Sequence, residues 1–177
     1  MKQFNVPTKE QVSQENQQIF DHLKAKIGFV PNIYATYAYS SSALSRYLTF
    51  ANGRTSLNNK EKEIINLIVS QINECTYCLA AHTAIGKMNG FDDEQIIELR
   101  RGSASFDIKF DAMVKLAGEI IKNRGTITDI TLNKFYEVGY NDENLIDVIV
   151  AVGEKSITNF LHKATNVPVD FPEASSI

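Results

Sequence analysis

Two cysteines and a histidine lie close together in the middle of the sequence, in the segment CTYCLAAH that runs from Cys75 to His82. A helix turns by about 100° per residue, so positions 75, 78 and 82 fall within about 60° of one another. The two sulfur atoms and the imidazole therefore share one helix face. His82 follows Cys78 by four residues, the spacing that brings side chains on successive turns together. This grouping is suited to thiol redox chemistry.

The helix that carries this segment is expected to begin just before the cysteines. The apolar pattern of the preceding segment loses its clarity at Asn73 and Glu74, and Asn89-Gly90 is suited to end the new helix with a left-handed cap. Unpaired amides and the positive end of the helix dipole favour a thiolate near the start. A C-x-x-C pair beside an imidazole commonly has a lowered thiol pKa, and the thiolate is the nucleophile.

Two other interpretations of the cysteine pair are open from the residues alone. Two buried structural thiols would be inert. Cysteine and histidine also bind zinc, but a structural zinc site needs four ligands. The fourth would have to be His22 or His162, brought near by the fold, or a carboxylate such as Glu63. We expect no metal and no cofactor.

The rest of the chain is predicted to be helical. Helical periodicity dominates and no segment shows strand alternation, so the expected fold is all-α, a compact helical bundle. A single domain over residues 1–177 is expected, with the redox core at about 57–91. Helices are predicted at about 8–27 with Thr8 as the cap, 33–50 with a break near 40–42, 58–72, 74–89, 93–101, 106–123, 128–138 and 142–163, with an extended tail after Pro168.

Residues 90–98 resemble residues 139–147 in pattern. Each stretch has a glycine, an aromatic residue, a capping Asp or Asn, an acidic first turn and then an apolar face. One interpretation is a recurrent joint between helices, and the other is a duplicated helical hairpin. The segment 33–50 also carries a group of aromatic side chains, which are suited to a core or a subunit interface more than to a substrate cavity. They are Tyr34, Tyr37, Tyr47 and Phe50.

Composition excludes several classes of function. The net charge is -3 and no cluster of Lys and Arg is present, so a nucleic-acid partner is not expected. No apolar run has the length of a signal peptide or of a membrane span, which predicts a cytoplasmic protein without a membrane partner. Only two cysteines are present, which is not the pattern of a secreted disulfide scaffold. Short aromatic-rich helices also predict a homo-oligomer.

The cysteine pair, His82 and Glu63 together resemble a motif of the carboxymuconolactone decarboxylase-like superfamily, specifically of its AhpD-like alkylhydroperoxidase branch. The branch has a glutamate, eleven residues, C-x-x-C and a histidine four residues later, and Glu63, Cys75, Cys78 and His82 match in identity and spacing. The resemblance is strong over 57–91, and the segments 28–32 and 169–172 are similar to the peroxidase-related subgroup. One departure is Tyr77, which stands where the founding branch has a histidine.

The resemblance implies a thiol-dependent peroxidase that reduces organic hydroperoxides. Cys78 would attack the peroxide, and its sulfenic acid would condense with Cys75 to form a disulfide. His82 would take the thiol proton and return one to the leaving alkoxide, while Glu63 would orient His82 or relay its proton. The decarboxylase branch lacks the cysteine pair, so decarboxylation would leave both cysteines unexplained.

Two alternative functions stay open from the residues themselves. They are a general dithiol-disulfide oxidoreductase and a metal-binding helical module, since Cys and His are also zinc ligands. The expected partners are a small hydroperoxide substrate and a dithiol or protein reductant. Similar family members assemble as trimers or hexamers, so the resemblance implies an oligomer of that kind.

Overall fold

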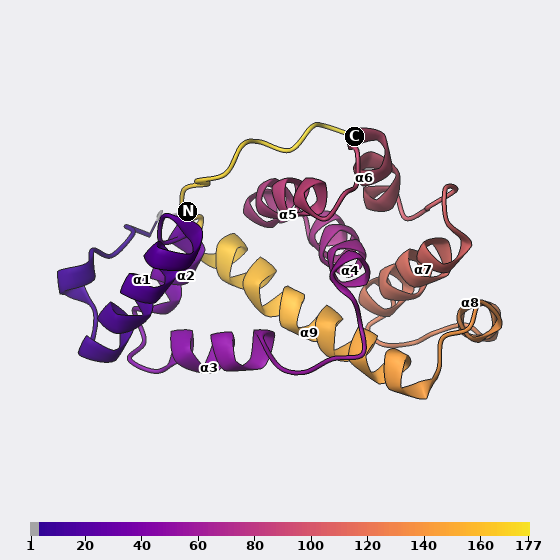
Figure 1. Ribbon diagram of the computed structural model, residues 1–177, viewed down its shortest axis with the longest axis horizontal. Coiled ribbons are helices and arrows are strands. Elements are labelled where there is room, and N and C mark those ends of the chain that lie inside the picture. The colour runs from indigo at the N-terminus through magenta and orange to yellow at the C-terminus, as the bar shows by residue number, and fades with distance from the viewer. Residues whose placement is uncertain (1–3) are drawn as a thin grey trace. The chain divides into compact units, whose positions relative to one another are not determined.

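The structure, a computed structural model, describes residues 4–177, and within this part of the chain the regular elements are all helical (Figure 1). This confirms the predicted fold class. A 3-10 helix covers Lys9–Gln11, and the α-helices are α1 Gln14–Ile27, α2 Asn32–Tyr37, α3 Ala43–Ala51, α4 Asn59–Ile72, α5 Thr76–Met88, α6 Asp93–Arg100, α7 Ile108–Lys122, α8 Asp129–Glu137 and α9 Asp142–Thr165. No helix among the described residues is both long and apolar enough to cross a membrane.

The chain forms two compact units. One contains the described residues up to Arg54 together with Leu161–Asp170, and the other contains Thr55–Phe160 and Phe171–Ile177. The whole of the predicted redox core, residues 57–91, belongs to the second unit. The expectation of a single domain stays a prediction.

The first helix begins later than the sequence predicts. Thr8 caps only the short 3-10 helix, where its backbone N–H donates to the Gln11 side chain at 2.9 Å. The chain is extended at Val12, and α1 then begins under a second cap, in which the Ser13 hydroxyl accepts from the backbone of Asn16. Two capping residues five positions apart therefore divide the predicted helix into two pieces.

Two of the four aromatic residues expected to form a core or an interface are buried in the first unit. The rings of Tyr37 and Tyr47 are buried and stack with centroids 4.5 Å apart, and Tyr34 packs obliquely on Tyr47. Phe50 lies exposed on α3. The buried Asn16 side chain donates to the carbonyls of Ala38 and Ser40, which holds the turn between α2 and α3.

Helix α4 is the centre of the second unit, where it contacts α5, α6 and α7. Its apolar side chains are almost completely buried, and they include Ile64, Ile65, Leu67 and Val69. Helix α7 approaches α4 closely at Gly118, where an added Cβ would lie 3.3 Å from Ile68. This packing makes α4 a rigid support for any residue placed on it.

Residues 90–98 and 139–147, the two stretches with a similar sequence pattern, form similar joints between helices. Gly90 and Gly139 both have positive φ, as a left-handed helix end requires. Asp92 and Asn141 each accept a hydrogen bond from the backbone three residues later and receive one back, the reciprocal pattern of a capping box. The two stretches therefore form the same kind of joint, as both interpretations of the repeat predict.

Candidate active site

The joint between α4 and α5 is a tight turn that places Cys75 at the start of α5. Asn73 ends α4, and the backbone N–H of Cys75 donates to the carbonyl of Ser70 at 2.9 Å. Between them, Glu74 adopts a left-handed conformation with φ 53°, which is uncommon for a residue other than glycine. Cys75 is then the N-cap of α5. The predicted helix start is confirmed to within two residues.

Cys75 and Cys78 form a disulfide, with Cα atoms 5.3 Å apart. Both residues are buried, with exposed fractions of 0% and 2%. The backbone N–H of Cys78 donates to the Sγ of Cys75 at 3.3 Å. The sulfur of Cys75 therefore lies against an otherwise unpaired amide at the positive end of the helix, where a thiolate is stabilised after reduction.

His82 lies one turn beyond Cys78 on α5 and pairs with a carboxylate on α4. Its Nδ1 lies 2.7 Å from Oε2 of Glu63, and both side chains are largely buried, with exposed fractions of 13% and 8%. The other carboxylate oxygen, Oε1, accepts from the Asn66 side chain at 2.9 Å. When neutral His82 donates through Nδ1, its Nε2 is left as a proton acceptor.

The electrostatics of the pair favour a charged Glu63. Burial raises the pKa of Glu63, but the positive charge of His82, hydrogen bonds from His82 and Asn66, and the charge of Lys155 together outweigh burial. The pKa of Glu63 therefore lies below its ordinary value. A buried carboxylate fixed in this way can orient an imidazole and balance the charge of its protonated form.

Tyr77, at the position where the founding branch has a histidine, is a packing residue. Its ring is buried and meets the ring of Phe171 edge-on, with centroids 5.7 Å apart. The last residues of the chain end beside α6 (Figure 1), where Arg100 donates to the carbonyl of Ser175 and to the side chain of Gln71. Phe171 of the tail therefore packs on Tyr77, one of the two residues between the cysteines.

The structure joins the four predicted site residues into two pairs on neighbouring helices. Glu63 pairs with His82, and Cys75 bonds to Cys78. Sequence reasoning missed two side chains that act on Glu63, which are Asn66 and Lys155. Asn66 carries a recognisable signal, because it is a polar residue between the apolar Ile65 and Leu67. Lys155 carries no such signal, because it lies between Glu154 and Ser156.

The histidines considered as further metal ligands do not belong to this pair of helices. His22 is exposed on α1, and His162 belongs to the part of α9 in the first unit. Within residues 4–177, no three His, Cys, Asp or Glu side chains are grouped so that they could hold a metal ion.

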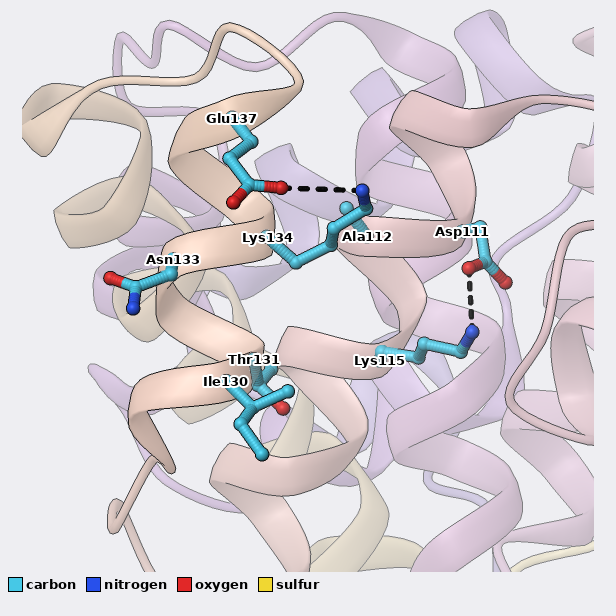
Figure 2. Close-up of a pocket in the computed structure, with 8 residues that line it drawn as sticks. All are labelled: Asp111, Ala112, Lys115, Ile130, Thr131, Asn133, Lys134 and Glu137. Atoms are coloured by element: carbon cyan, nitrogen blue, oxygen red, sulfur yellow. Dashed lines mark hydrogen bonds and ion pairs between the residues drawn. The ribbon is translucent and has the colours of Figure 1, made fainter.

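A surface pocket of about 500 Å³ lies between α7 and α8 (Figure 2). Its charged side chains are paired with each other, Lys115 with Asp111 at 2.6 Å and Lys134 with Glu137 at 3.3 Å. None of the cysteine, histidine or glutamate side chains of the candidate site lines it.

Comparison with solved structures shows the same fold in related proteins. A peroxidase-related protein from Silicibacter sp. TM1040 is 26% identical, with a TM-score of 0.82 over 97% of this chain and 91% of that chain. A peroxidase-related protein with an alkylhydroperoxidase AhpD core, from Ralstonia eutropha JMP134, is 20% identical, with a TM-score of 0.85 over 95% and 92% of the two chains. The debrominase Bmp8, solved with 2,3,4-tribromopyrrole, is 13% identical, with a TM-score of 0.73 over 89% and 86%.

Sequence comparison identifies the family. No curated protein matches the chain in sequence. The profile of the carboxymuconolactone decarboxylase family matches residues 39–130, which include α4, the cysteine pair and His82. The chain therefore belongs to the carboxymuconolactone decarboxylase family and has the AhpD-like helical fold of its peroxidase-related members.

Proposed function

We propose that this protein is a thiol-dependent peroxidase that reduces organic hydroperoxides through a Cys75–Cys78 dithiol/disulfide cycle. The observation that carries the proposal is the redox-capable cysteine pair at the start of α5, one turn from an imidazole held by a buried carboxylate. The likeness to peroxidase-related proteins supports the same activity.

In the first step, the Cys78 thiolate attacks the terminal oxygen of R–O–O–H. The S–O bond forms as the O–O bond breaks, giving a sulfenic acid on Cys78 and the alcohol R–OH. His82 accepts the thiol proton and returns a proton to the leaving alkoxide. Glu63 holds the imidazole in place and balances its charge when it is protonated.

In the second step, Cys75 attacks the sulfenic sulfur of Cys78, which forms the disulfide and releases water. The hydrogen bond from the Cys78 amide favours a thiolate on Cys75, as a resolving thiol requires. An external dithiol then returns both cysteines to the reduced state and leaves as its own disulfide. A cycle that needs this regeneration supports a cytoplasmic location, where thiols are kept reduced.

A general dithiol-disulfide oxidoreductase is the second candidate, because the same disulfide could serve a protein partner. Burial of both sulfurs favours the peroxidase, since a small hydroperoxide reaches a buried sulfur more readily than a thiol on a folded protein does. The fold alone does not decide the reaction, because it also serves a debrominase.

The test is consumption of an organic hydroperoxide in the presence of a small dithiol, measured in parallel with reduction of a disulfide substrate. We expect wild type to consume peroxide, Cys78→Ser to be inactive, and Thr76→Ser, a matched change between the cysteines, to keep full activity. Disulfide reduction without peroxide consumption would instead identify the second candidate.

A further inference from the structure

The disulfide of the candidate site is enclosed, although the proposed function requires its reduction in every cycle. Cys75 and Cys78 have exposed fractions of 0% and 2%, and Tyr77, which lies between them in the sequence, is also 2% exposed. A reducing thiolate must reach a sulfur atom before it can form the mixed disulfide, so access limits the rate. Reduction therefore requires that some part of this enclosure moves.

The helices that carry the site are packed too firmly to be the moving part. On α4 the side chains of Ile64, Ile65 and Leu67 are completely buried, and the backbone N–H of Cys75 is bonded to the carbonyl of Ser70 at the start of α5. Separation of α4 from α5 would expose this apolar core to water, which costs a large share of the free energy of unfolding.

Residues 171–177, which we call the strap, are held more weakly. They belong to the same unit as the cysteines, contain no helix, and are mostly exposed. The ring of Phe171 meets Tyr77 edge-on, with centroids 5.7 Å apart, and this contact places the strap against the cysteine segment. Segments with few buried contacts open at a small cost in free energy. Release of the strap is therefore the least costly way to uncover this segment.

A buried arginine on α6 anchors the strap at a second point. Arg100 is only 5% exposed, and its Nη1 donates to the carbonyl of Ser175 at 2.7 Å. Its Nε donates to the side chain of Gln71 on α4 at 2.9 Å, which fixes the guanidinium in place. Hydrogen bonds from a charged donor are stronger than those between neutral groups. The strap is thus held by Phe171 near the cysteines and by Arg100 farther along.

We propose that the strap determines which reductants reach the Cys75–Cys78 disulfide, by admitting a small dithiol and hindering a thiol on a folded protein. This inference deepens the proposed function, on which it rests for its biological meaning. In the reducing step, one thiolate of the dithiol attacks a sulfur and the S–S bond breaks, which gives a mixed disulfide. The second thiol then displaces the protein sulfur. The dithiol leaves as a disulfide, and its two hydrogens pass to the two cysteines.

The experiment compares two reductants of different size on the oxidised protein, without any peroxide. Dithiothreitol is the small dithiol and reduced thioredoxin, in excess, is the protein dithiol. Alkylation followed by mass spectrometry measures the rate at which free thiols appear. We expect Phe171→Ala to raise the rate with thioredoxin roughly tenfold, and the rate with dithiothreitol no more than about threefold, because loss of one aromatic contact favours release of the strap.

Two further variants test whether the effect belongs to the strap. Arg100→Met removes the other anchor and should also raise the thioredoxin rate more than the dithiothreitol rate. Phe4→Ala is the matched control, because Phe4 meets Tyr39 edge-on at 5.9 Å in the first unit. It should leave both rates unchanged. Equal gains with the two reductants, or no gain in either strap variant, would overturn the proposal.

Urea separates release of the strap from unfolding of the whole protein. Release exposes little surface, so the reduction rate should depend only weakly on urea below the unfolding transition. A dependence as steep as that of global unfolding would overturn the proposal, because the disulfide would then be reduced in the unfolded chain. If the protein did not consume peroxide, the proposed function would fail, while the reduction rates would still decide the role of the strap.

Discussion

Glu63 and His82 are nineteen residues apart in sequence, and the structure brings Oε2 of the carboxylate to 2.7 Å from Nδ1 of the imidazole. The two residues come from neighbouring helices, α4 and α5, which a tight turn at Glu74 joins. The pair links the buried core of α4 to the helix that carries the cysteines, so the proposed proton transfer rests on this contact.

Glu63→Gln should slow the reaction of the reduced protein with peroxide by roughly 10- to 100-fold, because a neutral amide neither fixes the reactive tautomer nor balances a protonated imidazole. Stopped-flow measurement of a single turnover checks the rate, and circular dichroism checks that the helices are kept. Glu94→Gln, an exposed change on α6, is the matched control and should have no effect. A wild-type rate in Glu63→Gln would remove Glu63 from the mechanism.

The stability of the fold should depend on Glu63 at acidic pH. Its pKa in the folded state lies below its ordinary value of 4.5, so the ionised form stabilises the fold above that pH. This contribution should be lost as the pH falls from 4.5 through the folded-state pKa. Urea denaturation of oxidised wild type and Glu63→Gln from pH 7 to pH 3 measures it. The stability difference between them should shrink toward low pH, and a difference that stayed constant would contradict the assignment.

The two cysteines should react unequally with peroxide. Cys75→Ser should react once and accumulate a sulfenic acid on Cys78, because Cys78 is one turn from His82 and the resolving thiol is missing. Cys78→Ser should not react appreciably, although its remaining sulfur accepts a hydrogen bond from the amide of residue 78. A sulfenic-acid reagent and peptide mapping locate the label. Labelling of Cys75 at the wild-type rate in Cys78→Ser would reverse the two roles.

The prediction of a homo-oligomer is supported by an exposed apolar surface on α9. One side of α9 exposes a row of apolar residues at helical spacing, comprising Ile146, Ile149, Val150, Ile157 and Phe160. Light scattering of wild type at micromolar concentration should report more than one chain per particle. Ile149→Glu with Ile157→Glu should lower the mass, whereas Ile130→Glu, on the exposed side of α8, should not. A monomeric wild type would contradict the prediction and leave the thiol chemistry untouched.

Local signals in the sequence were enough to predict most helix boundaries. Asn58 caps α4 with a reciprocal bond to Glu61, and Gly90 takes the left-handed conformation after α5, as their residue types indicate. The wrong prediction that the first long helix begins at Thr8 also comes from a local capping signal. Thr8 and Ser13 both carry a capping signal, and residue preferences alone do not decide which of them starts the long helix.

The sequence by itself determined the chemistry that one helix can hold. The placement of Cys75, Cys78 and His82 on a single face follows from the helix repeat, which acts within a few residues. Only the tertiary structure decided which groups act on that face from other helices. Glu63 meets His82, Lys155 acts on Glu63, and Phe171 covers Tyr77, all through the packing of separate elements. Such contacts depend on the relative rotation and register of whole helices, which the burial of their apolar faces sets and which no local sequence pattern specifies.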